Sequence, residues 1–269
     1  MSNKMFSIEI SAELNQIQLI KHYLKKWRPS FVSINNLSET RFEDIVQITN
    51  YIKKDLKIPV LVHMSAISKT KDEIITELKT LESYGIHRIL ALQGNLYHGI
   101  NIKNDFHYAS DLVKFINDYD KSIEIFGTCY PEKHPEAKDL KSDIEHLKIK
   151  VNAGAIGLIS QICFDNEKVY QFIQKIRKQD INVPVFSGIM PVTKDYQLHW
   201  LDHNMISTHG KFDNVNELDQ YGVNFSVNQI NDLLKHNVDG IHLYTMNDWQ
   251  TTDAIYDKIK HNFQKKESF

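Results

Sequence analysis

Eight short apolar runs, rich in β-branched residues, alternate along this chain with segments of helical spacing. The runs lie near residues 5–10, 31–35, 58–64, 88–93, 122–129, 156–164, 183–191 and 240–246. One strand-and-helix unit for roughly every 33 residues favours a closed (β/α)8 barrel, the TIM barrel of the α/β class. The alternative is an open, doubly wound sheet, but no Gly-x-Gly-x-x-Gly sequence follows the first run. Because no linker or change of composition interrupts the pattern, we predict that residues 1–269 form one domain.

Between the runs, apolar residues recur on one helical face. The spacing predicts helices near 17–27, 42–52, 70–81, 140–151, 169–176 and from Ser226 to Leu233. Thr70 and Glu73 form a capping-box pattern, and Gly85 lies where a helix would end. Between Thr193 and Tyr221 the pattern blurs, so we expect there a polar loop that covers a bound substrate.

Composition excludes several classes of protein. The chain has 34 acidic and 32 basic residues, a net charge of −2, which removes the electrostatic argument for nucleic acid or an anionic membrane as partner. No apolar run is long enough to span a bilayer. Cys129 and Cys163 have neither metal-ligand spacing nor a Cys-x-x-Cys arrangement, so we predict no metal site and a reducing, cytoplasmic location.

Polar residues occur where the predicted strands end, which in a barrel is where catalytic groups collect. Glu9 lies inside the first apolar run. Burying a carboxylate there costs free energy unless it is paired with another group or serves in catalysis. The other strand-end residues are His63, Gln93, Gly94, Asn95, Gln161, Tyr244 and Asn247. Taken singly, each also fits a structural role, such as an ion pair for Glu9 or a backbone hydrogen bond for Gln161.

Asp143, His146 and Lys150 share one stripe of the helix predicted over 140–151, because they are three and four residues apart. A solvated face is one interpretation. The other is a binding surface on which Asp143 accepts ribose hydroxyls and Lys150 meets phosphate charge.

Longer motifs resemble the methylenetetrahydrofolate reductase family, which consists of flavin-dependent (β/α)8 barrels, over nearly the whole chain. The most specific is Tyr130-Pro131-Glu132-x-His134-Pro135-Glu136-Ala137, followed at the family's spacing by Leu147-Lys148-x-Lys150-Val151. Others are Phe6-Ser7-Ile8-Glu9, Leu90-Ala91-Leu92-Gln93-Gly94-Asn95, Tyr108-Ala109-Ser110-Asp111-Leu112, Gly188-Ile189-Met190-Pro191-Val192 and His242-x-Tyr244-Thr245-x-Asn247.

The resemblance implies an oxidoreductase of one-carbon metabolism that uses NAD(P)H and FAD to reduce 5,10-methylenetetrahydrofolate to 5-methyltetrahydrofolate. The implied kinetics are ping-pong, and the implied assembly is a homo-oligomer. Glu9 would be the general acid, and we expect burial to raise its pKa so that it keeps its proton near neutral pH. The residues implied to hold FAD are Asn35, His63, Gln93, Gly94, Asn95, Tyr108, Ala109, Tyr130, His134, Ala137, Asp143, His146 and Lys150. Those implied to contact the folate are Asn95, Gln161 and Tyr244.

The chain departs from the family pattern at the fourth strand, where Gln93 and Asn95 replace an Arg and an Asp. Because Asn95 removes a negative charge beside the flavin, we expect a higher reduction potential and a weaker hydride donor. Gln93 and Ile149 remove two cations that would offset pyrophosphate charge, so FAD binding is expected to be weak, with FMN as an alternative.

Three further departures lie elsewhere in the chain. Asp248 replaces an Arg that the resemblance implies would meet the folate's glutamate tail, which predicts weaker attraction for that tail. His146 replaces an Asn, and the loop at 35–38 is short and lacks glycine.

These departures keep two alternatives open. One is a diverged flavoprotein of the same fold that acts on another substrate or receives electrons from a partner protein. The other is a non-catalytic paralogue, against which the retained Glu9 and Gln161 argue.

Overall fold

The computed structural model describes residues 4–36, 40–94 and 101–263. Its strands are β1 (Met5–Ile10), β2 (Phe31–Ile34), β3 (Val60–Ser65), β4 (Arg88–Leu92), β5 (Glu124–Cys129), β6 (Ala155–Ser160), β7 (Val185–Ile189) and β8 (Gly240–Tyr244). Neighbouring strands pair in parallel, and β8 pairs with β1 to close the barrel. The prediction of a (β/α)8 barrel, with strands at those eight runs, is therefore confirmed.

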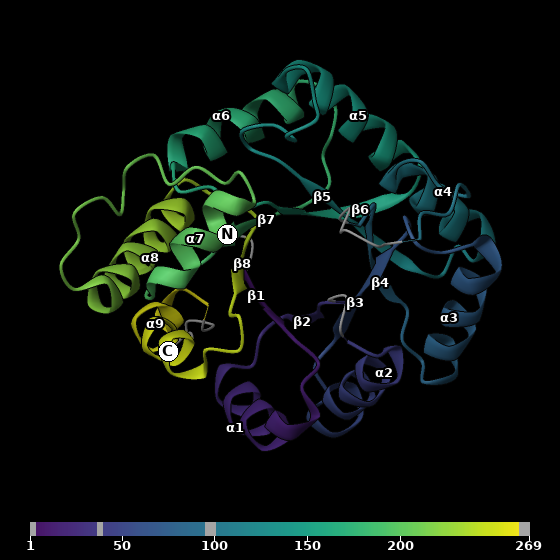
Figure 1. Ribbon diagram of the computed structural model, residues 1–269, viewed down its shortest axis with the longest axis horizontal. Coiled ribbons are helices and arrows are strands. Elements are labelled where there is room, and N and C mark those ends of the chain that lie inside the picture. The colour runs from purple at the N-terminus through teal and green to yellow at the C-terminus, as the bar shows by residue number, and fades with distance from the viewer. Residues whose placement is uncertain (1–3, 37–39, 95–100, 264–269) are drawn as a thin grey trace, which may run out of the picture.

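Helices follow the strands in chain order, and all except α7 form a ring around the barrel (Figure 1). They are α1 (Ile17–Trp27), α2 (Phe42–Tyr51), α3 (Lys71–Ser83), α4 (Ala109–Tyr119), α5 (Leu140–Asn152), α6 (Asn166–Arg177), α7 (Asp195–His203), α8 (Leu218–Lys235) and α9 (Trp249–Ile259). Over the described ranges, none of these helices combines the length and the apolar character that a bilayer crossing requires.

The capping box predicted for α3 is present. The hydroxyl of Thr70 accepts from the backbone N–H of Glu73 at 3.2 Å, and the Glu73 carboxylate accepts from the Thr70 N–H at 2.6 Å. Gly85, just after the helix, has φ +65°, a left-handed conformation that glycine adopts without strain.

Two layers of side chains fill the barrel interior. The lower layer is apolar and consists of Phe31, Leu61, Leu90, Phe126, Ile159 and Phe186. Because side chains alternate between the two faces of a strand, the inward residues one step closer to the carboxyl ends are two positions later. On β2 and β3 these are Ser33 and His63, both buried. A polar layer therefore rests on an apolar floor at the end of the barrel where barrel enzymes carry their active sites.

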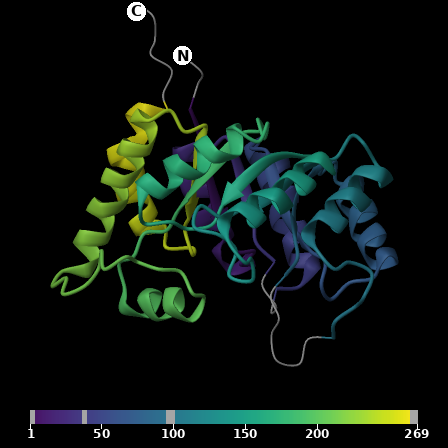
Figure 2. The same ribbon diagram turned by 90° about the horizontal axis from the view of Figure 1, so that it is seen from above.

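The segment 193–221 contains a helix that the sequence pattern did not predict. Figure 2 shows α7 (green, lower edge) apart from the ring of helices. Its first turn is stabilised by the buried side chain of Gln197, whose oxygen accepts from the N–H groups of Thr193 (2.7 Å) and Lys194 (2.9 Å). Apolar spacing does not reveal a helix whose start depends on one buried amide.

Helix α8 begins at Leu218, earlier than the predicted Ser226. The roughly two additional turns pack against the chain after β7. A side chain at Gly222 would overlap the carbonyl oxygen of Val192 and lie 2.6 Å from its carbonyl carbon. Glycine is needed at position 222 so that the backbone of α8 can approach that of Val192. Because glycine is a weak helix former, the sequence pattern predicted a helix that is too short.

Candidate active site

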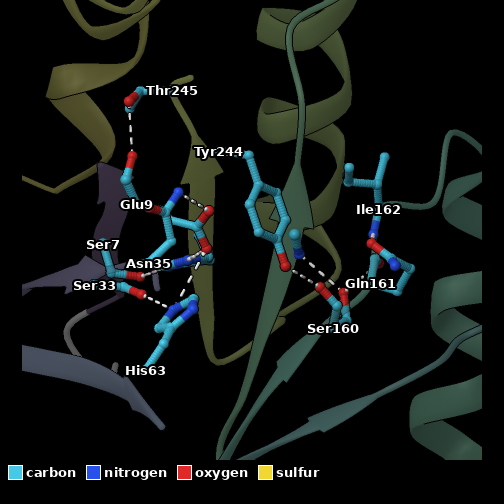
Figure 3. Close-up of polar contacts among 12 residues, drawn as sticks. Ser7, Glu9, Ser33, Asn35, His63, Ser160, Gln161, Ile162, Tyr244 and Thr245 are labelled. Carbon is cyan, nitrogen blue, oxygen red and sulfur yellow. Dashed lines mark hydrogen bonds and ion pairs between the residues drawn. The ribbon is translucent and has the colours of Figure 1, made fainter. Parts of the chain in front are cut away.

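Glu9 projects from β1 into the polar layer, where side chains from three other strands or strand ends surround it (Figure 3). Its register partners are Ser33 on β2 and Tyr244 on β8. One carboxylate oxygen accepts from the side-chain amide of Asn35 at 3.3 Å. The other lies 3.5 Å from Nε2 of His63. The carboxylate is thus held among polar groups and faces the mouth of the barrel, with 18% of its side chain exposed.

His242 on β8 lies near the same carboxylate oxygen as His63 and is fully buried. Its Nε2 atom is 4.0 Å from Oε2 of Glu9 and has no hydrogen-bond partner among the described residues. Its Nδ1 atom is 2.8 Å from the hydroxyl of Ser7, which also donates to the Ile241 carbonyl at 3.1 Å. A hydroxyl that donates to a carbonyl accepts from Nδ1–H, which leaves Nε2 as an acceptor toward Glu9. The Nε2 atom of His242 and the carboxylate of Glu9 therefore face each other across 4.0 Å.

His63 occupies the polar layer in its neutral form. Burial lowers the pKa of its ring below the usual 6.5, although the nearby Glu9 charge opposes that shift. Its Nε2 atom is 2.5 Å from the hydroxyl of Ser33. His63 therefore contacts Glu9 as a polar, uncharged neighbour at neutral pH.

The expectation that burial keeps Glu9 protonated near neutral pH is wrong for this structure. Burial does raise the pKa of Glu9, but the interaction with His242, the positive charges that His63 and His242 carry when protonated, and the Asn35 hydrogen bond lower it more. The pKa of Glu9 therefore lies below the usual value of a glutamate carboxyl. These partners come from β3, β8 and the residue after β2, so none was adjacent to Glu9 in the sequence.

Tyr244 stands between Glu9 and Gln161 in Figure 3. Its hydroxyl donates to the Ser160 carbonyl at 2.9 Å, and burial together with the Glu9 charge raises its pKa well above 10.0, so the phenol stays neutral. The side-chain oxygen of Gln161 accepts from the N–H of Ile162 at 2.9 Å, which leaves its amide nitrogen to meet a ligand.

A cavity of about 580 Å³ opens between α4 and α5, beside the carboxyl ends of β4 and β5. Its lining includes many of the residues implied to hold FAD: Gln93, Tyr108, Ala109, Tyr130, His134, Ala137, Asp143, His146 and Lys150. Residues scattered over almost sixty positions of the chain therefore meet in one place, and the roles assigned to them stay predictions.

Charged groups in the cavity wall are fixed by the backbone around them. The Asp143 carboxylate accepts from the N–H of His134 at 2.9 Å, which joins α5 to the loop after β5. The Lys150 ammonium donates to the Thr128 carbonyl at 2.8 Å, and burial lowers its pKa. No carboxylate forms an ion pair with Lys150 among the residues that the structure describes. A desolvated ammonium without an acidic partner is suited to an anionic ligand.

The remaining implied residues lie outside this cavity lining. Asn35 and His63 contact Glu9, and their implied roles toward FAD stay predictions. Gly94, two residues after β4, has φ +93°, and a side chain there would overlap the Ser65 hydroxyl, so only glycine fits. Asn95 falls outside the described residues, and its effect on the flavin stays a prediction.

Sequence reasoning assigned no role to Ser7, Ser33 or His242. Each is a buried polar residue in an otherwise apolar strand. Ser7 precedes Glu9 by two positions and His242 precedes Tyr244 by two, so the period of a strand places each on the same face as a recognised site residue. That alternation was the available signal.

Comparisons with known proteins show which family the sequence resembles. The family model described as methylenetetrahydrofolate reductase matches residues 10–260. A 5,10-methylenetetrahydrofolate reductase from Buchnera aphidicola subsp. Baizongia pistaciae is 31% identical over 259 residues, covering 91% of this chain and 86% of the relative. The Escherichia coli (strain K12) protein of the same name is 31% identical over 248 residues, covering 86% and 81%.

Among solved structures, an uncharacterized protein from Clostridium thermocellum that binds two copies of 5-methyl-5,6,7,8-tetrahydrofolic acid has a similar fold. The TM-score is 0.72 at 17% identity, over 97% of this chain and 96% of that one. At 17% identity, this similarity shows a shared fold and nothing more.

Proposed function

Because the chain belongs to the methylenetetrahydrofolate reductase family, we propose that it reduces 5,10-methylenetetrahydrofolate to 5-methyltetrahydrofolate by ping-pong kinetics, with NAD(P)H as reductant and FAD as cofactor. The observation that carries the proposal is the Glu9 carboxylate beside His242, in a polar layer at the barrel mouth. We further propose that residues 1–269 act as one catalytic domain, since the barrel uses strands from Met5 to Tyr244.

The cavity between α4 and α5 fits a flavin nucleotide in size and chemistry. Asp143 offers a carboxylate for ribose hydroxyls, and Lys150 offers a buried ammonium for phosphate. Tyr130 and Ile149 add apolar surface to the same wall. When bound there, FAD would supply the hydride that the reduction requires.

Glu9 supplies the proton. In 5,10-methylenetetrahydrofolate one carbon bridges two nitrogens, and protonation of one nitrogen lets its bond to that carbon break. The carbon is left as a cationic iminium that accepts hydride and becomes the methyl group. The proton leaves the Glu9 carboxyl, whose anion is then stabilised by Asn35 and by the neighbouring imidazoles.

His242 and Ser7 allow Glu9 to act as an acid although its pKa is lowered. In this scheme His242 holds a proton on Nε2, the ring atom 4.0 Å from the carboxylate, and the Ser7 hydroxyl accepts from Nδ1–H in either protonation state of the ring. When substrate excludes water from the mouth, the charged pair loses solvation, which favours transfer of that proton to Glu9. His242 is a positioning residue in this scheme.

Tyr244 and Gln161 position the folate. The neutral Tyr244 ring forms a wall beside Glu9, and the free amide nitrogen of Gln161 is a donor for the acceptor atoms of the pterin. Both are held through backbone groups of β6 or the residues after it, so they are ordered before substrate binds.

The experiment that tests the proposal follows the flavin absorbance of purified protein under anaerobic conditions. The proposal predicts that NADH or NADPH bleaches the flavin. It also predicts that 5,10-methylenetetrahydrofolate restores the absorbance and is converted to 5-methyltetrahydrofolate. A flavoprotein that is bleached but not reoxidised by the folate would instead support the diverged flavoprotein, the alternative that Gln93 in the cavity wall favours. Protein that takes up no flavin would contradict both.

A further inference from the structure

We propose that Ser160 is a positioning residue for the half-reaction in which methylenetetrahydrofolate reoxidises the flavin, and that it acts by holding Tyr244 and Gln161 in place at the barrel mouth. This inference rests on the proposed function, in which those two residues position the folate. Ser160 is the last residue of β6 and is buried, with 2% of its surface exposed. Its hydroxyl and its carbonyl bond to β7, to β8 and to Gln161, so it joins three strands beside the folate.

The hydrogen-bond ladder between β6 and β7 is interrupted at Ser160. The paired register of the two strands ends at Ile159 and Phe186. If the parallel ladder continued, the N–H of Gly188 would donate to the backbone carbonyl of Ser160. It donates instead to the Ser160 hydroxyl, at 2.9 Å. The hydroxyl therefore replaces the carbonyl as the acceptor for β7 and leaves that carbonyl to another donor.

The other donor is the hydroxyl of Tyr244, which lies 2.9 Å from the Ser160 carbonyl oxygen (Figure 3). Tyr244 belongs to β8, so its side chain must cross β7 to reach β6. The crossing is possible because residue 188 is glycine. A side chain at Gly188 would lie 2.7 Å from Cε2 of Tyr244 and 2.3 Å from the Ser160 carbonyl oxygen. The position of the Tyr244 ring is therefore set by β6 and β7 as well as by its own strand.

The same serine fixes Gln161. The Ser160 hydroxyl donates to the Gln161 carbonyl at 3.0 Å, and the Gln161 N–H donates to the Cys129 carbonyl at 2.8 Å. The side-chain oxygen of Gln161 accepts from the N–H of Ile162, so its amide nitrogen has a set direction. One hydroxyl thus donates to the residue that offers a donor to the folate and accepts from the strand that Tyr244 crosses.

The Tyr244 ring also contacts the histidine beside the proton donor. Its centroid is 5.1 Å from that of His242, and the two rings are nearly perpendicular, at 89°. Edge-to-face packing of this kind favours one relative orientation of the rings. A displaced Tyr244 would therefore disturb both the folate and the imidazole that faces Glu9. Flavin reduction by NAD(P)H should be spared, because the proposed function gives these side chains no part in it.

The test is a stopped-flow comparison of both half-reactions. Ser160→Ala removes the hydroxyl and lets the Gly188 N–H compete with Tyr244 for the carbonyl of residue 160. Reoxidation by methylenetetrahydrofolate should slow about five- to tenfold, as for one lost buried hydrogen bond, while bleaching by NAD(P)H stays within about twofold of wild type. Ser160→Thr keeps the hydroxyl and should restore reoxidation to within about threefold. The matched control is Ser187→Ala, which removes a buried hydroxyl of β7 that has no hydrogen-bond partner among the described residues.

A double-mutant cycle separates positioning from a purely structural role. Tyr244→Phe removes the hydroxyl that bonds to the Ser160 carbonyl and should slow the same half-reaction. If Ser160 acts through Tyr244, adding Ser160→Ala to Tyr244→Phe should slow reoxidation further by less than about twofold. Effects that multiply in the double variant, or equal slowing of both half-reactions in Ser160→Ala, would overturn the inference.

The inference and the proposed function fail in different ways. Ser160→Ala protein that folate reoxidises as fast as it does wild type would overturn the inference alone. If Ser160→Ala does not fold, Tyr244→Phe decides, because reoxidation at the wild-type rate in that variant would also overturn it. Wild-type protein whose reduced flavin is not reoxidised by methylenetetrahydrofolate would overturn the proposed function and the inference with it.

Discussion

The Nε2 atom of His242, fully buried and without a hydrogen-bond partner among the described residues, lies 4.0 Å from the carboxylate of Glu9. An orphaned buried nitrogen is costly, so its placement opposite an ionisable group points to a shared proton. The Ser7 hydroxyl fixes the far side of the ring. We regard this pair, more than Glu9 alone, as the acid of the site.

Replacement of His242 should therefore change the pH dependence. In His242→Gln, burial still raises the pKa of Glu9 while its strongest lowering interaction is lost, so that pKa rises. An acid that must be protonated loses activity as pH increases through its pKa, and the alkaline limb of the folate half-reaction should move to higher pH. Stopped-flow rates of flavin reoxidation across pH measure this shift.

His63→Gln is the control for that experiment. The lowered pKa of His63 keeps its ring neutral at neutral pH, so its removal should move the alkaline limb less than His242→Gln does. Equal shifts in the two variants, or none in either, would count against the His242–Glu9 pair.

Flavin binding should depend on the charged groups of α5. Lys150→Met removes the buried ammonium and is expected to raise the Kd for FAD about tenfold or more, as for loss of one charge-assisted hydrogen bond. Fluorescence titration of the apoprotein measures it, with Lys141→Met, an exposed change on the same helix, as control. An unchanged Kd in Lys150→Met would place the phosphates elsewhere.

The contact between α8 and the chain after β7 should be intolerant of a side chain. Gly222→Ala introduces a methyl group against the backbone of Val192 and is expected to lower the free energy of unfolding by about 2 kcal/mol. Gln220→Ala, exposed on the same helix, should be nearly neutral. Urea denaturation compares them, and equal midpoints would show that the contact relaxes at no cost.

Much of the fold could be predicted because each strand is a local apolar run, and parallel pairing through helices follows from their alternation. Helix α7 could not, because its first turn depends on the buried side chain of Gln197, which bonds to the backbone of Thr193 and Pro191 just before the helix. The spacing of apolar residues does not reveal a polar side chain in that role.

In the candidate site, too, features set by local spacing could be predicted and those set by distant strands could not. Asp143 and Lys150 share a helix, so their common face was predictable from spacing. The direction in which the pKa of Glu9 shifts was not predictable, because His63 and His242 approach the carboxylate from strands far apart in the sequence. The contact of the Asn35 amide with Glu9 was not predicted, because the two residues are 26 positions apart in the chain.

Glu9→Gln tests the account most directly, by stopped-flow measurement of both half-reactions on the same preparation. Gln keeps the shape of the side chain and removes the transferable proton. The account predicts that NAD(P)H still bleaches the flavin at a rate near that of wild type, while reoxidation by methylenetetrahydrofolate slows by roughly 10²- to 10⁴-fold, the usual contribution of a general acid. Reoxidation at the wild-type rate would contradict it.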